Sequence, residues 1–310
     1  MLADRRTFLK TAALVPTAGL LHAAKAGGCK LAIGTYGLQS LPLAEAIRVV
    51  AETGYDALEI TAFEGTTGAP AALEDRGKRA EIRQTIEDGG LSLGGLMAGL
   101  QPQQDDDAHR EQLEELKQLI ELAHDLAPEN PPLIQTVLGG KNWEESRDLF
   151  RDRLADWLQL AADRKGVLSI KPHRGHAMSL PAHANWLVEQ LGAPDRLGTV
   201  YDYSHYAFRE PPLSIAETVA AALPHTNYVA VKDAVQRDGK IVFALAGESR
   251  NWDHADIVRA FHEGGYRGDF CCEVSSQIWR NNPDYDPVAS TQLCYRNMAA
   301  AFERANVPRG

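Results

Sequence analysis

The stretch Val167-Leu-Ser-Ile-Lys-Pro-His-Arg-Gly-His-Ala-Met-Ser179 joins a short buried-strand pattern directly to a cluster of ionisable side chains. A β-strand sends alternate residues to opposite faces, so we expect Leu168 and Ile170 on one face and Lys171 and His173 on the other. In a parallel α/β protein, ligands bind where the strands end. The stretch therefore predicts a site at the carboxyl end of this strand, although an ordinary strand before a solvated loop would also fit it.

Strand-like and helix-like patterns alternate on both sides of this stretch. The other apolar runs of strand length cover 30–36, 56–61, 91–98, 132–138, 198–202, 228–233 and 268–273. Segments of helical spacing separate them, at 43–53, 74–88, 105–128, 143–164, 181–191, 213–223, 252–264 and 287–305. Since no long linker or repeat interrupts this order, residues 27–310 are predicted to form a single (β/α)8 barrel domain.

Residues 1–26 have the pattern of a twin-arginine export signal. Arg5 and Arg6 precede the apolar run 11–21, and Ala24-Lys25-Ala26 offers a small-residue cleavage site. The apolar run is shorter than the roughly 20 residues that a membrane-spanning helix needs. We therefore expect export to the periplasm, with no membrane span.

Charge and cysteine content narrow the range of partners. The net charge is −10, and removal of the signal takes away four basic residues and one acidic residue, which leaves −10 − (4 − 1) = −13. A nucleic-acid partner is not expected, because phosphate binding needs a basic face. The four cysteines (Cys29, Cys271, Cys272 and Cys294) show no C-x-x-C spacing, so neither a metal cluster nor a disulfide framework is indicated.

Ionisable residues stand at the carboxyl ends of the predicted strands. They are Glu59, Lys171, His173, Asp202, His205, Lys232 and Glu273. In a closed barrel these ends meet at one mouth, so residues that are far apart in the chain become neighbours.

Several short motifs at these positions resemble one known family. They are Lys171-Pro-His-Arg-Gly-His176, Asp202-Tyr-Ser-His205, Val231-Lys-Asp233, Ala246-Gly-Glu248 and Gly264-Gly-Tyr-Arg-Gly268. In their order and spacing they resemble the xylose isomerase-like TIM barrels, the sugar phosphate isomerase/epimerase family, over essentially the whole mature chain. The resemblance implies a barrel enzyme that isomerises or epimerises a sugar.

The resemblance also implies a divalent metal (Mn, Mg or Co) held by four strand-end residues. Asp202 and Glu273 match two of these metal positions, whereas Lys171 and Ala230 stand where the family has Glu and His. A divalent cation cannot accept an ammonium group as a ligand. We therefore expect Lys171 to pair with Asp202 and Glu273, and any metal to be weakly held or absent.

The implied chemistry is removal of a proton next to a carbonyl, with a positive centre to stabilise the enediolate. Glu273 is the expected base, and His205 or His173 would bind or protonate sugar hydroxyls. Lys171 or Lys232 would take the place of the metal's charge. Given a depressed pKa, Lys171 would alternatively form a Schiff base.

Five residues are expected to bind substrate: Glu59, Lys232, Tyr36, Trp279 and Arg280. No phosphate-binding loop of P-loop spacing is present, and an exported protein is expected to meet an unphosphorylated sugar. Two alternatives stay open, a sugar lyase or hydratase and a non-catalytic carbohydrate-binding barrel. Abasic-site endonucleases share the fold, but the acidic charge argues against that activity. The sequence leaves the oligomeric state open.

Overall fold

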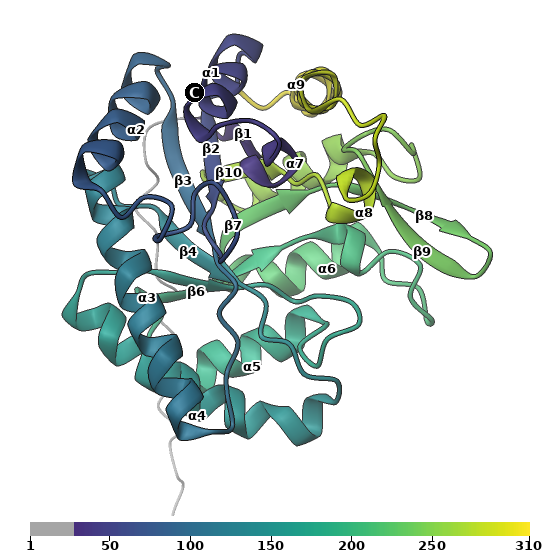
Figure 1. Cartoon of the computed structure of the whole chain (residues 1–310). Coiled ribbons are helices and arrows are strands. Elements are labelled where there is room, and N and C mark those ends of the chain that lie inside the picture. The colour runs from purple at the N-terminus through teal and green to yellow at the C-terminus, as the bar shows by residue number, and fades with distance from the viewer. Residues whose placement is uncertain (1–27) are drawn as a thin grey trace, which may run out of the picture.

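Eight parallel strands form a closed barrel in this computed structural model, which describes residues 28–310 (Figure 1). The order around the barrel is β1-β10-β7-β6-β5-β4-β3-β2. The strands are β1 (Lys30–Gly34), β2 (Ala57–Thr61), β3 (Ser92–Met97), β4 (Leu133–Thr136), β5 (Leu168–Ile170), β6 (Leu197–Tyr201), β7 (Thr226–Val231) and β10 (Asp269–Cys272). The predicted (β/α)8 fold is confirmed, and the predicted export signal lies outside the described residues.

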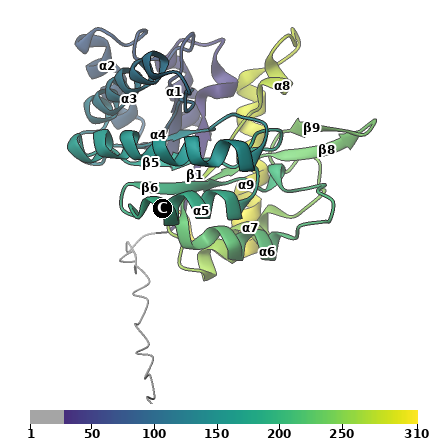
Figure 2. The same ribbon diagram turned by 90° about the horizontal axis from the view of Figure 1, so that it is seen from below.

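Helices surround the barrel, as the two perpendicular ribbon views show (Figures 1 and 2). They are α1 (Leu43–Thr53), α2 (Arg76–Asp88), α3 (Asp106–Leu126), α4 (Trp143–Asp163), α5 (Pro181–Leu191), α6 (Ile215–Ala222), α7 (His254–Glu263) and α9 (Pro287–Ala305). Their ends follow local chemistry: the Asp105 carboxylate accepts hydrogen bonds from the Asp107 and Ala108 amides, and Gly54 ends α1 at φ 99°. None of the helices in residues 28–310 is long and apolar enough to cross a membrane.

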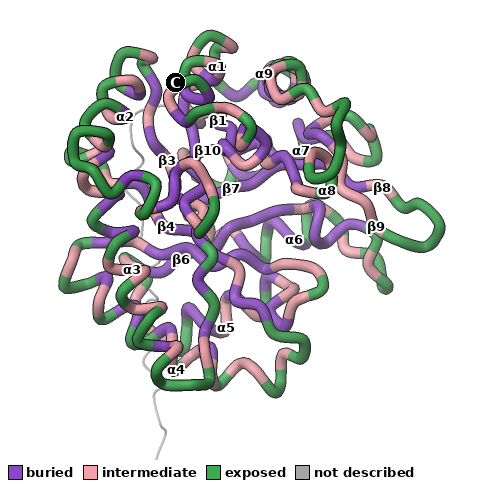
Figure 3. The backbone as a smooth tube through the Cα atoms, in the orientation of Figure 1, coloured by how far each residue is buried: buried purple, intermediate pink, exposed green. Residues whose placement is uncertain are grey.

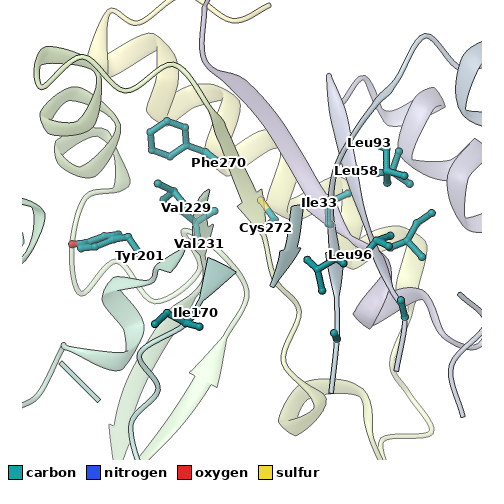
Figure 4. Close-up of a cluster of buried hydrophobic side chains, with 14 of the residues drawn as sticks. Ile33, Leu58, Leu93, Leu96, Ile170, Tyr201, Val229, Val231, Phe270 and Cys272 are labelled. Atoms are coloured by element: carbon teal, nitrogen blue, oxygen red, sulfur yellow. The ribbon is translucent and has the colours of Figure 1, made fainter. Parts of the chain in front are cut away.

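The barrel strands are mostly buried, as their colouring in Figure 3 shows, and their side chains fall into two apolar clusters. Outward-facing side chains such as Ile170, Tyr201 and Val231 belong to the large apolar cluster to which the helices also contribute, part of which is drawn in Figure 4. Burying one such aliphatic side chain stabilises the fold by about 1.5–3 kcal/mol. A smaller cluster, which includes Val200, Ala230 and Cys271, is formed by the alternate positions of these strands.

This alternation places the ionisable residues. Asp202, Lys232 and Glu273 each stand two positions after a member of this smaller cluster, namely Val200, Ala230 and Cys271. They therefore continue the inner face of their strands, just beyond the ends of β6, β7 and β10. Lys171 stands in the same relation to β5, whose Leu168 and Ile170 lie in the outer cluster as expected. The apolar pattern of the strands therefore directs these charges into the barrel mouth.

Two elements near the mouth differ from expectation. The strand predicted over 30–36 ends at Gly34, because Thr35–Leu38 forms a 3-10 helix, η1. The strand predicted over 228–233 ends at Val231, and Asp233 instead begins an antiparallel hairpin of β8 (Asp233–Arg237) and β9 (Lys240–Ala244).

The sequence analysis did not include this hairpin, which projects from the barrel in Figures 1 and 2. Its turn residues Asp238 and Gly239 have φ values of 49° and 72°, the left-handed pair that an Asp-Gly hairpin turn requires. A short helix after β10, α8 (Ser276–Trp279), was also missed. Both elements border the site described next.

Candidate functional site

Four charged side chains of alternating sign meet at the barrel mouth. Lys171, Asp202, Lys232 and Glu273 follow β5, β6, β7 and β10, which are consecutive neighbours in the barrel. Each ammonium group contacts both carboxylates, and we call this set the ion quartet. Lys171 Nζ lies 2.9 Å from Asp202 Oδ2 and also donates to Glu273 Oε2. Lys232 Nζ lies 2.9 Å from Glu273 Oε1 and also donates to Asp202 Oδ2.

The ion quartet is almost closed to solvent. Lys171, Asp202 and Lys232 are 3%, 0% and 1% exposed. The side chain of Glu273 is 12% exposed, so it forms the accessible corner of the quartet. A buried charge is tolerated only when it is paired, and here two positive charges balance two negative ones.

The pairing sets the protonation states. Burial disfavours the charged form of Glu273, but Lys171 and Lys232 outweigh it and lower the pKa of this carboxyl from 4.5 to about 2. The same two lysines hold the pKa of Asp202 well below its usual range in spite of burial. For Lys171, burial is again outweighed, and Asp202 and Glu273 raise the pKa of the ammonium. The depressed pKa that a Schiff base on Lys171 requires is therefore not present.

Two of the predicted histidines lie against the ion quartet. His205 is fully buried, with Nε2 3.4 Å from Asp202 Oδ2 and 3.3 Å from Lys232 Nζ. The His173 ring packs on the His205 ring at a centroid distance of 4.0 Å. Burial is the largest cause that lowers the pKa of His205 to about 4, and burial together with His205 lowers the pKa of His173 to about 2. Both imidazoles are therefore neutral at pH 7, so each donates a hydrogen bond from one ring nitrogen and accepts at the other.

Glu59 lies inside the barrel and is 1% exposed. Its Oε2 accepts a hydrogen bond of 2.7 Å from Gln135 Nε2. Gly34 and Gly95 flank it on the two neighbouring strands, where an added Cβ would come within 2.9 Å and 3.3 Å of the carboxylate oxygens. Burial and the charge of Glu273 raise the pKa of Glu59 to about 7. Its expected contact with substrate stays a prediction.

The remaining predicted binding residues form a group at the rim. Tyr36 on η1 and Trp279 on α8 meet edge to face at a centroid distance of 5.3 Å, and the Arg280 guanidinium lies 5.5 Å from the Trp279 ring centre. The Phe63 ring also meets the Tyr36 ring edge to face, at a centroid distance of 5.7 Å. The geometry gives these side chains a common location, and their role in substrate binding stays a prediction.

Phe243, on the unpredicted hairpin, covers part of the ion quartet. Lys232 Nζ lies 4.9 Å from the centre of its ring, and the His205 ring meets it at 5.2 Å. The backbone amide of Phe243 donates to Gln277 on α8, which connects the hairpin to the rim group. The Asp-Gly turn between two alternating runs was the sequence signal for this element. Gln135, the partner of Glu59, carried no comparable signal.

The residues at the mouth do not fit a divalent cation of the kind that the resemblance implies. The space between the Asp202 and Glu273 carboxylates is taken by the ammonium groups of Lys171 and Lys232. Ala230, at the position where the family has His, lies in the apolar inner cluster. Across residues 28–310, no group of three or more His, Cys, Asp or Glu side chains is placed to hold a metal ion.

Several solved structures share this fold. An L-ribulose 3-epimerase superposes with a TM-score of 0.69 and 18% identity, over 90% of this chain and 96% of that one. The 3-keto-D-glucoside 4-epimerase YcjR from E. coli superposes with a TM-score of 0.66 and 14% identity, over 89% of this chain and 99% of that one. A xylose isomerase-like barrel from Mycobacterium smegmatis in complex with magnesium superposes with a TM-score of 0.67 and 18% identity, over 92% of this chain and 99% of that one. The chain spans 43% of a longer fusion protein that joins such a barrel to a 4-hydroxyphenylpyruvate dioxygenase.

At these identities the structural matches establish the fold alone, and no curated protein matches the chain. The model of the family described as "Xylose isomerase-like TIM barrel" matches residues 47–292, which is most of the sequence. The chain therefore belongs to the xylose isomerase-like TIM barrel family.

Proposed function

We propose that this protein is a sugar isomerase or epimerase that removes a proton next to a carbonyl without a bound metal. The ion quartet carries the proposal, because it places an accessible carboxylate, Glu273, between two ammonium groups at the barrel mouth. The structural neighbours that are sugar epimerases support the reaction class. The twin-arginine pattern at Arg5 and Arg6 supports export to the periplasm, where an unphosphorylated sugar is the expected substrate.

Substrate binding would activate Glu273. In the resting quartet both lysines hold its pKa at about 2, which makes it a weak base. A carbonyl or hydroxyl oxygen of the sugar that accepts a hydrogen bond from Lys171 or Lys232 would replace one of the bonds to Glu273. The carboxylate would become more basic at the moment when the ammonium stabilises negative charge on the substrate oxygen.

The neutral imidazoles would complete the site. His173 is uncharged at pH 7 and its Nδ1 has no partner within the described residues, so it could bind a sugar hydroxyl without adding positive charge. His205 would act by positioning, because its Nδ1 accepts from the Arg174 amide and its Nε2 contacts Asp202 and Lys232. The rim group of Tyr36, Trp279 and Arg280 would contact the more exposed part of the sugar.

The test is exchange of the carbon-bound proton next to the carbonyl. Mature protein is incubated in D2O with a panel of ketoses and aldoses, and deuterium incorporation is followed by NMR. We expect Glu273→Gln to slow exchange by about 10²- to 10⁴-fold, the usual contribution of a general base. The control is Glu248→Gln, at an exposed carboxylate that accepts from the Leu245 amide. Exchange that is equally fast in Glu273→Gln would refute the assigned base.

A carbohydrate-binding barrel without catalysis is the second candidate. The near-complete burial of Lys171, Asp202 and Lys232 favours it, because a closed quartet offers substrate only one corner. Sugar binding without exchange in the wild-type protein would support this candidate. A lyase or hydratase would use the same first proton transfer and would be recognised by an unsaturated or hydrated product.

A further inference from the structure

Two arginines border the mouth beside the histidines. Arg174 lies in the loop after β5, one residue beyond His173, and Arg209 lies in the loop after β6. Both side chains are partly buried. The sequence analysis assigned no role to either of them.

The two guanidinium groups converge on one backbone oxygen. Arg209 Nε donates to the His205 carbonyl at 3.3 Å, and Arg174 Nη2 donates to the same carbonyl at 3.5 Å. Arg174 also donates to the Ala207 carbonyl, and Arg209 Nη2 donates to the Ser179 carbonyl at 3.1 Å. Two positive charges are thus held at the backbone carbonyl of a residue whose ring contacts the ion quartet.

No carboxylate neutralises this arginine pair. Within residues 28–310, neither Arg174 nor Arg209 forms a salt bridge with any carboxylate. Asp202 attracts Arg174, but its Oδ2 is already bound by Lys171, Lys232 and His205, and its Oδ1 accepts hydrogen bonds from Ser204. Burial and the charge of Arg209 lower the pKa of Arg174, as expected for like charges held close together.

Polar atoms at this position also lack partners. Arg174 Nη1 and His173 Nδ1 are buried and have no hydrogen-bond partner within the described part of the chain. A buried donor without a partner costs about 1–3 kcal/mol, so a ligand group that accepts from it gains affinity. A planar guanidinium matches an acidic oxygen pair better than any other side chain.

We propose that the substrate of this site carries an acidic group, and that Arg174 and Arg209 bind it. A sugar acid fits best, because its carboxylate is planar and the substrate is expected to be unphosphorylated. This inference rests on the proposed function in taking the barrel mouth as the substrate site, and it adds the class of substrate. The carboxylate would occupy the arginine pair while the carbonyl end of the sugar reaches Lys171, Lys232 and Glu273.

The test compares matched acidic and neutral sugars by titration calorimetry at low ionic strength. The probes are D-glucuronate and D-galacturonate, the neutral D-glucose and D-galactose, and the two hexose 6-phosphates. We expect the mature protein to bind acidic sugars more tightly than neutral ones. Arg174→Gln and Arg209→Gln should each weaken acid binding by about tenfold to hundredfold, the loss of one charge-assisted hydrogen bond, and leave neutral sugars unaffected.

The chain offers a matched control in Arg196. This arginine also donates to a backbone carbonyl, that of Gly166, but it precedes β6 and so lies at the opposite end of the barrel. Arg196→Gln should bind acidic sugars as the wild type does. If Arg174→Gln does not fold, Arg174→Lys and Arg209→Gln take its place in the comparison.

Three results would overturn the proposal: no acidic sugar binds, acidic and neutral sugars bind equally, or the preference survives both substitutions. Arginine-dependent preference for the 6-phosphates over the uronates would support the acidic group and identify it as a phosphate. Arginine-dependent acid binding without any deuterium exchange would refute the proposed catalysis alone. Exchange on neutral sugars without an acid preference would refute this inference alone.

Discussion

Replacing Lys171 by Met tests the ion quartet directly, because Met keeps an unbranched chain of similar size and removes only the charge. Asp202 would keep Lys232 and His205, and Glu273 would keep Lys232 alone. Lys171 and Lys232 together lower the pKa of Glu273 from 4.5 to about 2 against the effect of burial. At 1.36 kcal/mol for each pKa unit, that difference corresponds to about 3 kcal/mol of stability.

The Met variant removes one of these two ammonium groups and should lose about 3–5 kcal/mol of unfolding free energy at pH 7, the usual cost of breaking a buried ion pair. The pH dependence has a definite sign. Glu273 has a depressed pKa in the folded state, so its stabilisation is present above pH 4.5 and is lost as the pH falls toward about 2. The difference in unfolding free energy between the wild type and Lys171→Met should shrink over the same pH range.

Urea unfolding followed by circular dichroism, at several pH values between 7 and 3, measures this difference. The control is Lys117→Met, at an exposed ion pair with Glu114 whose two side chains are 33% and 56% exposed. That substitution should cost less than about 1 kcal/mol. A Lys171→Met variant as stable as wild type at pH 7, or a loss that does not change with pH, would refute the reasoning.

Two further predictions concern the neighbours of the ion quartet. Burial and Glu273 raise the pKa of Glu59 from 4.5 to about 7, so this carboxyl destabilises the fold progressively as pH rises through that range. The unfolding free energy of Glu59→Gln should equal that of the wild type near pH 4 and exceed it by about 3 kcal/mol at pH 8. Equal stability of the two proteins at pH 8 would contradict this prediction. Burial lowers the pKa of His205 to about 4, and the Phe243 ring supplies part of the cover. In Phe243→Ala, an NMR titration should therefore show the pKa of His205 rising toward 6.5. Phe208→Ala, at an exposed ring that contacts Trp252, should leave this pKa unchanged.

The barrel could be predicted from sequence because strand alternation and helix spacing depend on local patterns. Leu168 and Ile170 face the outer cluster and Lys171 faces the mouth, as a period of two requires. The pairing of Lys171 with Asp202 and Glu273 could also be predicted, since two carboxylates at one mouth need a cation between them. The sequence pattern also placed Lys232 at the mouth. The carboxylates that Lys232 contacts, however, depend on which strands are neighbours in the barrel, here β6, β7 and β10.

Other features depend on how loops fold against each other. Arg174 and Arg209 lie in different loops, and only their shared contact with the His205 carbonyl brings them together. The cover that Phe243 provides requires β9 to bring this ring against Lys232, just beyond the end of β7. The Asp-Gly turn signals only a local hairpin and does not show this contact. The raised pKa of Glu59 comes from complete burial, and a strand-end carboxylate in a sequence does not show how deep it lies.

Metal analysis of the purified mature protein tests most directly whether two ammonium groups replace the ion. The protein is equilibrated with MnCl2, desalted, and assayed for bound metal and for sugar deuterium exchange with and without added Mn. Because Lys171 and Lys232 lie between Asp202 and Glu273, we predict no tightly bound metal and no gain in exchange when Mn is added. One Mn held per chain, or exchange that depends on the ion, would contradict the account.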